Sequence, residues 1–214
     1  MDTFLERVTF YDLYGYTVPG SFFLLMIISP YFSDILRILE KYEKIGIYIF
    51  ALVILLSFIF GILISEISHY LFYKYLNIRK IRFSHLHIAN LGIPERKLLH
   101  ALIRAGLCSM DRRSALDILP KAIPYIYSDI QSDTTYKRIH NYASCEVLYR
   151  NLALALAGTL VLTIMQSGVS RQTAVSCLLF GISTWLMLRR AYRFMVKKEQ
   201  YAVYWFVEKY SKRY

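Results

Sequence analysis

The sequence is poor in the residues that usually build disulfide scaffolds and metal sites, and it lacks the common catalytic motifs. Its 214 residues include only three cysteines, Cys108, Cys145 and Cys177. Their odd number and their spacing fit neither a disulfide framework nor a CxxC zinc site, so we expect free thiols in a reducing compartment. Glycine-rich phosphate loops, nucleophile elbows, HExxH and paired carboxylate motifs are all missing. We therefore predict a protein without enzyme activity, cofactor or metal.

The amino-terminal residues do not have the features of a removable signal peptide. Residues 1–12 include Asp2, Glu6, Arg7 and Asp12, and they have neither a basic n-region nor a small-residue cleavage site. We expect this segment to be retained in the mature protein, so the first apolar segment after it should be a permanent part of the fold.

Long stretches of the chain carry no charge at all. The sequence has 26 basic and 15 acidic residues, yet 56% of its residues are hydrophobic. Residues 45–64 are uncharged, and these 20 residues are enough to cross about 30 Å of hydrocarbon. Residues 14–32 are also uncharged, but Pro19-Gly20 and Pro30 interrupt them, which predicts an irregular entry turn followed by a short span.

Two further apolar segments lie in the second half of the chain, at residues 151–165 and 172–188. Because so few residues separate them, they should form an antiparallel hairpin. We predict four transmembrane helices in all. A re-entrant third and fourth segment is the alternative.

The distribution of lysine and arginine predicts the orientation of these spans. With four spans, the amino terminus, the middle region and the carboxyl-terminal tail share one side of the membrane and hold 22 basic residues, against four on the other side. Because segments rich in lysine and arginine stay in the cytoplasm, both termini should be cytoplasmic.

The middle region, residues 65–150, should fold as a helical cytoplasmic region. Pro94 predicts a helix start with Leu98 and Leu102 on one face, and a second helical stretch from Ser132 should continue into the third span. Residues 119–133, with two prolines, predict a loop packed by its tyrosines. Segments two and four should continue as helices beyond the membrane.

The fold class that follows is an all-α integral membrane protein with four transmembrane helices and cytoplasmic helical extensions. We divide it into residues 1–64 with the first two spans, the inserted cytoplasmic region 65–150, the transmembrane hairpin 151–188, and a basic aromatic helix at 189–214.

Two patterns resemble chemical sites. Arg82 and His87 lie in a run similar to the arginine and histidine motif of HEPN ribonucleases, where histidine acts as acid or base and arginine stabilises phosphate charge. A basic stretch beside the membrane explains the same residues without chemistry. Glu66 and His69 have the spacing of a di-iron helix motif, but only one copy is present, so a carboxylate at the water boundary is the favoured interpretation.

The basic residues of the tail have two interpretations. They fit the anionic lipid head groups that bind lysine and arginine beside a membrane. The alternative is a docking surface for an acidic protein or a nucleic acid, since the cytoplasmic side has 22 basic and 12 acidic residues. Interleaved aromatics favour a packed interface. The candidate contact residues are Arg189, Arg190, Arg193, Lys197, Lys198, Tyr204 and Trp205.

Residues 10–20, FYDLYGYTVPG, carry a resemblance to known proteins. The run, followed at once by an apolar span, resembles the membrane-entry motif of small bacterial inner-membrane proteins, several of them encoded in antiphage defence loci. Its motif residues are Asp12, Gly15, Tyr16, Pro19 and Gly20. Physically, the glycines allow close backbone approach, Pro19 fixes a turn, and Asp12 is placed to cap the first helix.

With four spans and one cytoplasmic insert, the chain resembles the membrane component of the Kiwa defence system, and less closely the membrane accessory proteins of type VI-B CRISPR loci. This resemblance implies a homo-oligomeric sensor or scaffold at the bacterial inner membrane, coupled to a soluble cytoplasmic effector that binds nucleic acid. The alternatives are an oligomeric pore that depolarises the membrane and a membrane-anchored nuclease that uses Arg82 and His87.

Overall fold

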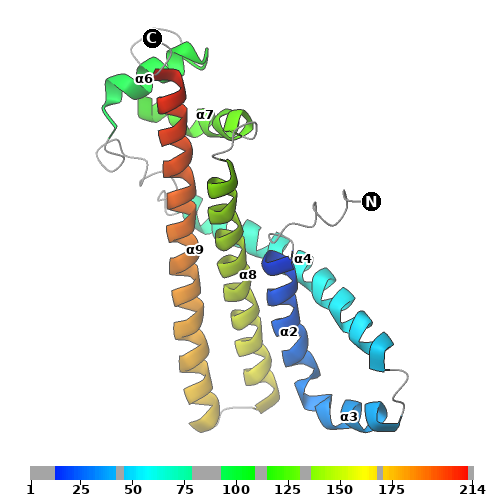
Figure 1. Ribbon diagram of the computed structural model, residues 1–214. Coiled ribbons are helices and arrows are strands. Elements are labelled where there is room, and N and C mark those ends of the chain that lie inside the picture. Colours follow the sequence, from blue (N-terminus) through cyan, green and yellow to red (C-terminus); the bar gives the residue numbers. More distant parts are fainter. Residues whose placement is uncertain are drawn as a thin grey trace. The chain divides into compact units, whose positions relative to one another are not determined.

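The computed structural model describes residues 13–41, 46–78, 93–108, 115–130, 136–167 and 171–211, and every regular element among them is helical (Figure 1). The predicted all-α class is confirmed for these residues. The elements are η1 (Leu13–Thr17), α2 (Val18–Ile28), η2 (Ser29–Tyr31), α3 (Phe32–Lys41), α4 (Gly46–Ile78), α6 (Glu95–Arg104), α7 (Ala115–Ile130), α8 (Tyr136–Ser167) and α9 (Arg171–Ser211).

Among the described residues, four helical stretches are long and apolar enough to cross a membrane, and this agrees with the predicted number of spans. The predicted continuation of segments two and four is also confirmed, because α4 and α9 run well past Ile64 and Leu188 without a break. The four stretches are Gly15–Arg37, Gly46–Leu76, Arg138–Met165 and Thr173–Ser211.

The chain forms two compact units that differ in charge. One consists of Met1–Phe72 and Ser144–Tyr192, and the other of Tyr73–Ala143 and Arg193–Tyr214. The first contains 8 basic and 8 acidic residues, whereas the second contains 18 basic and 7 acidic residues. We call them the apolar unit and the basic unit. All of the formal charge of +11 therefore belongs to the basic unit.

In the apolar unit, η1 and α2 meet α4 at glycines. A Cβ atom on Gly20 would overlap the backbone of Ser57, and one on Gly61 would overlap the backbone of Tyr16. Contacts this close between backbones are typical of helices that pack through small residues in membranes. The predicted close approach at Gly20 is confirmed.

The entry to α2 is irregular, as predicted, but its proline is placed differently. A single π-helical turn, Leu13–Thr17, precedes α2, and Pro19 lies in the first turn of the α-helix. The predicted turn at Pro19 is therefore wrong. A proline in the first helical turn has no intrahelical N–H partner to lose, so the helix accepts it without a break.

The basic unit has its own hydrophobic core, formed by α6, α7 and the parts of α8 and α9 in this unit. The predicted helix after Pro94 is confirmed as α6, with Leu98 and Leu102 fully buried. The core also includes Leu119, Ile126, Ile130, Ile139, Val203 and Phe206.

The predicted loop at residues 119–133 is wrong over the part that the structure describes, because α7 extends to Ile130 with Pro120 and Pro124 inside it. A proline inside a helix costs about 3 kcal/mol. Leu119, Ile126 and Ile130 are completely buried, and each contributes about 2 kcal/mol of hydrophobic free energy. Together these three side chains contribute about 6 kcal/mol, which offsets the cost of two prolines at about 3 kcal/mol each. That gain cannot be read from local sequence preferences.

The glycine contacts lead to a first prediction. Gly20→Ala should lower the free energy of unfolding by about 2 kcal/mol, because the added methyl group forces α2 away from the backbone of α4. Thermal unfolding of the purified protein in detergent measures the change.

Gly181→Ala is the matched control. No atom of the described residues lies within 4 Å of a Cβ atom at this position in α9, and alanine is the better helix former by up to about 1 kcal/mol. Equal losses in the two variants would contradict the backbone contact between α2 and α4.

Candidate functional site

The described residues of the entry motif connect the start of the chain to α4 and α8. The carbonyl oxygen of Gly15 accepts a hydrogen bond of 2.7 Å from Nδ2 of Asn151. The ring of Tyr16 meets the ring of Phe58 edge-on, with centroids 6.2 Å apart. Asp12, the predicted cap, lies outside the described residues. The motif residues that are described thus serve helix packing in the apolar unit.

A buried polar cluster joins these same helices. It consists of Ser68 on α4 and of Glu146, Arg150 and Asn151 on α8, whose exposed fractions are all between 0% and 4%. The Oγ of Ser68 lies 2.5 Å from Oδ1 of Asn151. Nε of Arg150 donates to Oγ of Ser68 at 3.0 Å, and Nη1 of Arg150 lies 3.4 Å from Oε1 of Glu146.

The polar cluster is a structural element rather than an open binding site. Taking a carboxylate and a guanidinium out of water costs several kcal/mol for each ion, and this cost is recovered only when the charges are paired and hydrogen-bonded. Glu146 and Arg150 meet this condition, since they are spaced one helical turn apart with the acid first. Together with Asn151 and Ser68, they fix α8, α4 and the carbonyl of Gly15 in one arrangement.

This cluster was not predicted from the sequence, although part of its signal is visible there. Glu146 and Arg150 directly precede the predicted span that begins at Asn151, and Ser68 follows one turn after the predicted span that ends at Ile64. A charge pair with helical spacing beside an apolar segment could have been read as an interhelical contact. The partner on α4 could not be found without the fold.

Two arginines of the apolar unit lie against aromatic rings near the end of the fourth predicted span. The guanidinium of Arg189 lies 5.4 Å from the ring centroid of Trp185, and that of Arg190 lies 5.5 Å from the ring centroid of Tyr149. Both arginines are exposed, and Trp185 is 57% exposed. Tryptophan beside arginine is typical of the boundary between a membrane and water.

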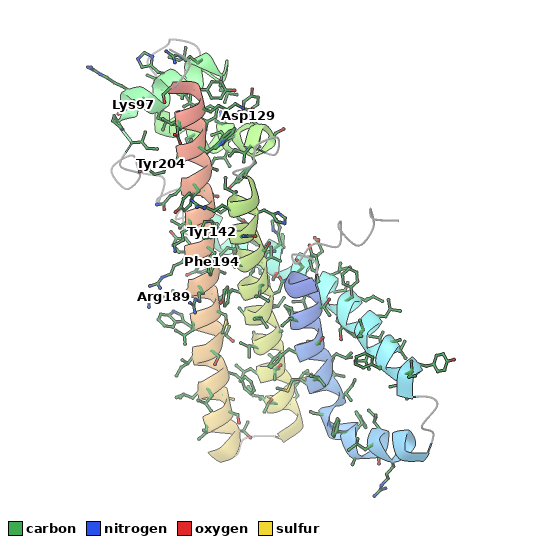
Figure 2. The ribbon with its side chains drawn as sticks, viewed as in Figure 1. Lys97, Asp129, Tyr142, Arg189, Phe194 and Tyr204 are labelled. Carbon is green, nitrogen blue, oxygen red and sulfur yellow. The ribbon has the colours of Figure 1, made fainter. Side chains whose placement is uncertain are left out.

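In the basic unit, α8 and α9 form a second aromatic arrangement, which we call the cation–tyrosine cluster (Arg138, Tyr142, Lys197 and Tyr201). The rings of Tyr142 and Tyr201 stack with centroids 5.3 Å apart at an angle of 23°. The guanidinium of Arg138 lies 5.7 Å from the Tyr201 centroid, and the ammonium of Lys197 lies 5.9 Å from the Tyr142 centroid. Phe194, labelled with Tyr142 in Figure 2, packs against the Tyr142 ring.

The carboxyl-terminal end of α9 is fastened to α6 and α7. Nζ of Lys209 lies 2.6 Å from Oδ1 of Asp129 and 4.7 Å from the ring centroid of Trp205. Nη1 of Arg104 donates a hydrogen bond of 2.7 Å to the carbonyl oxygen of Tyr210. These contacts hold the last turns of α9 in a defined place within the basic unit.

The structure separates the predicted contact residues into exposed and buried groups. Arg193 and Lys197 are exposed and Tyr204 is 50% exposed, so all three are available to a partner. Lys198 is half-buried beside the ring of Tyr127. Trp205 is only 9% exposed and belongs to the hydrophobic core. Substitution of Trp205 would therefore test the fold of the basic unit, whereas substitution of Tyr204 would test its surface.

The two patterns that resemble chemical sites are only partly visible. Glu66 and His69 are both exposed on α4. No group of three or more histidine, cysteine, aspartate or glutamate side chains that could hold a metal ion occurs among the residues that the structure describes. Arg82 and His87 lie outside those residues.

Comparisons of the chain with protein-family models, with curated proteins and with solved structures returned no match.

The polar cluster leads to a second prediction. Arg150→Ala should lower the free energy of unfolding by about 3–5 kcal/mol, because it leaves Glu146 buried without its partner. The double variant Glu146→Leu with Arg150→Met removes both charges and should be clearly more stable than the single variant. Chemical or thermal unfolding in detergent measures both.

The exposed Arg189 provides the control for this series. Arg189→Ala removes the same charge but only one exposed contact with an aromatic ring, so its cost should stay below about 1 kcal/mol. A double variant no more stable than Arg150→Ala would show that the buried charge is not the source of the loss.

Proposed function

We propose that this protein is a homo-oligomeric scaffold or sensor of the bacterial inner membrane, whose basic unit recruits a soluble partner in the cytoplasm. The distribution of charge carries the proposal. The apolar unit is formally neutral, whereas the basic unit has a charge of +11. Under the positive-inside rule, this difference supports a cytoplasmic position for the basic unit and for both termini.

A charged segment that served only to orient the spans would not need a core. The basic unit buries leucines, isoleucines and aromatic residues from several helices, including Leu98, Leu119 and Phe206 at 0% exposure. Its charges are therefore displayed on a folded body. Positive potential on a folded surface attracts acidic partners and speeds their encounter.

The link to antiphage defence rests on the resemblance of residues 10–20 to the entry motif of membrane proteins from defence loci. In such a system, the membrane component registers an event at the membrane and passes it to a soluble effector. The proposed partner is therefore a cytoplasmic effector protein encoded in the same locus.

Two hydroxyl groups, Ser57 on α4 and Thr159 on α8, favour a scaffold over a pore. Ser57 donates to the carbonyl oxygen of Val53 at 2.7 Å, and Thr159 donates to that of Ala155 at 2.9 Å. Both bonds stay within one helix, so the hydroxyl hydrogens are bonded to the helix backbone and do not point into a lumen. A conducting lumen instead needs polar groups directed toward water and ions. Conductance of the reconstituted protein would support the pore instead.

Topology is the third prediction. Reporter fusions after Glu43 and Gly168 should report an external position, and a fusion after Tyr214 should report a cytoplasmic one, because 22 of the basic residues then lie inside. Paired phosphatase and fluorescent-protein fusions distinguish the two sides. An external Tyr214 would refute the four-span orientation and the cytoplasmic platform with it.

Recruitment is the fourth prediction. Four exposed basic residues of the basic unit are replaced with glutamine. Most of the soluble protein encoded in the same locus should then leave the membrane fraction, because electrostatic steering of its encounter and charge pairing in the complex are both weakened. The four residues are Arg96, Lys97, Arg138 and Lys197. A Tyr214 reporter fusion of the same variant verifies that its topology is unchanged. Undiminished recruitment would refute the proposed function.

A further inference from the structure

We infer that the cation–tyrosine cluster, together with the exposed face of α9 beside it, is the docking site for an acidic helical segment of a soluble protein. This inference rests on the proposed function and names both the surface and the chemistry of the partner. Its members come from α8 and α9 and all lie within the basic unit.

The two cations of the cluster each lie against a tyrosine ring. Arg138 and Lys197 are exposed, and each lies within 6 Å of the centre of a tyrosine ring. Neither forms an ion pair with an acidic side chain anywhere in the described ranges. A cation resting on a ring has already given up part of its rotamer freedom, so it loses less entropy when a carboxylate binds.

The neighbouring face of α9 has the spacing of a helix-packing seam. Arg193, Lys197, Tyr201 and Tyr204 follow one another at intervals of four, four and three residues, and all four are exposed. Residues at these intervals form one stripe along a helix, and a second helix packs along such a stripe. The opposite face of α9 is already used, since Met195, Ala202 and Phe206 are buried.

The aromatic geometry favours an acidic protein over a nucleic acid. Proteins that bind single-stranded nucleic acid offer open ring faces on which bases stack. Here one face of Tyr142 and one face of Tyr201 are occupied by the other ring, and each ring also has a cation within 6 Å. The carboxylates of an acidic protein need no open ring face, because they form charge-assisted hydrogen bonds with the cations. The half-exposed ring of Tyr204 offers an apolar contact beside them.

The test uses the full chain in phosphatidylcholine nanodiscs, where the lipid itself carries no net charge. The probe is a fluorescent amphipathic helical peptide with glutamates at i and i+4 and leucines between them. A peptide with glutamine in place of glutamate is the negative probe. Binding is measured by fluorescence anisotropy. We expect the acidic peptide, and not the glutamine peptide, to bind saturably, and we expect its affinity to fall as the salt concentration is raised.

Substitutions then locate the site. Arg138→Gln with Lys197→Gln should weaken peptide binding at least about tenfold, because two positioned charges are lost. The control pair Arg96→Gln with Lys97→Gln removes the same charge from α6 and should change binding less than about threefold, since only long-range attraction is reduced. Arg138→Lys with Lys197→Arg keeps both charges and should stay close to the parent, which guards against a general folding defect.

Four results would overturn the inference. Equal losses in the two glutamine pairs would reveal attraction to the basic unit as a whole. No binding of the acidic peptide would reject the partner chemistry. An oligonucleotide probe that binds more tightly than the peptide, with the same dependence on Arg138 and Lys197, would identify a nucleic-acid interface. Binding of vesicles that contain phosphatidylglycerol, dependent on Arg138 and Lys197 and without binding of the peptide, would identify a lipid surface.

The same variants separate this inference from the proposed function. Recruitment that is lost in the fourfold variant but kept in the Arg138 and Lys197 pair would refute this docking site and leave the scaffold in place. Recruitment that survives in both would refute the scaffold itself.

Discussion

A buried guanidinium group must be paired and hydrogen-bonded, and this requirement at Arg150 organises the apolar unit. Its charge is balanced by Glu146 one turn earlier on α8, and its Nε reaches Ser68 on α4. Asn151 extends the network to the carbonyl oxygen of Gly15. The network therefore connects three segments that are far apart in sequence, and none of them can shift without exposing or orphaning a polar group.

The glycine contacts and the polar cluster make different contributions to the same assembly. Gly20 and Gly61 allow η1 and α2 to reach backbone contact with α4, and the dispersion attraction at this contact has no directional preference. Hydrogen bonds from Asn151 and Arg150 are directional, so they select one register among the many that apolar helices could adopt. Dispersion stabilises the close packing of the helices, and the polar network selects a single register for that packing.

Features that depend on local composition or on a single periodicity could be predicted from the sequence. The four apolar stretches, the helix after Pro94 and the continuation of α4 and α9 all belong to this kind. Features that depend on tertiary contact were missed. The helix α7 survives two prolines because Leu119 and Ile126 are buried by other helices, and Trp205 lies in the core although the sequence placed it among the candidate contact residues. The ring stacking of Tyr142 on Tyr201 joins positions 59 residues apart, beyond the reach of any local pattern.

Topology and recruitment place different demands on the same basic residues. The positive-inside rule needs charge close to the ends of the spans, and a lysine in any conformation provides it. It does not need a guanidinium 5.7 Å from the centre of a stacked tyrosine, nor a second cation on the neighbouring ring. Fixing these side chains has an entropic cost and adds little to stability at an exposed position. A role in orientation thus accounts for the charge of Arg138 and Lys197 but not for their positions against the rings, whereas the docking site proposed above accounts for both.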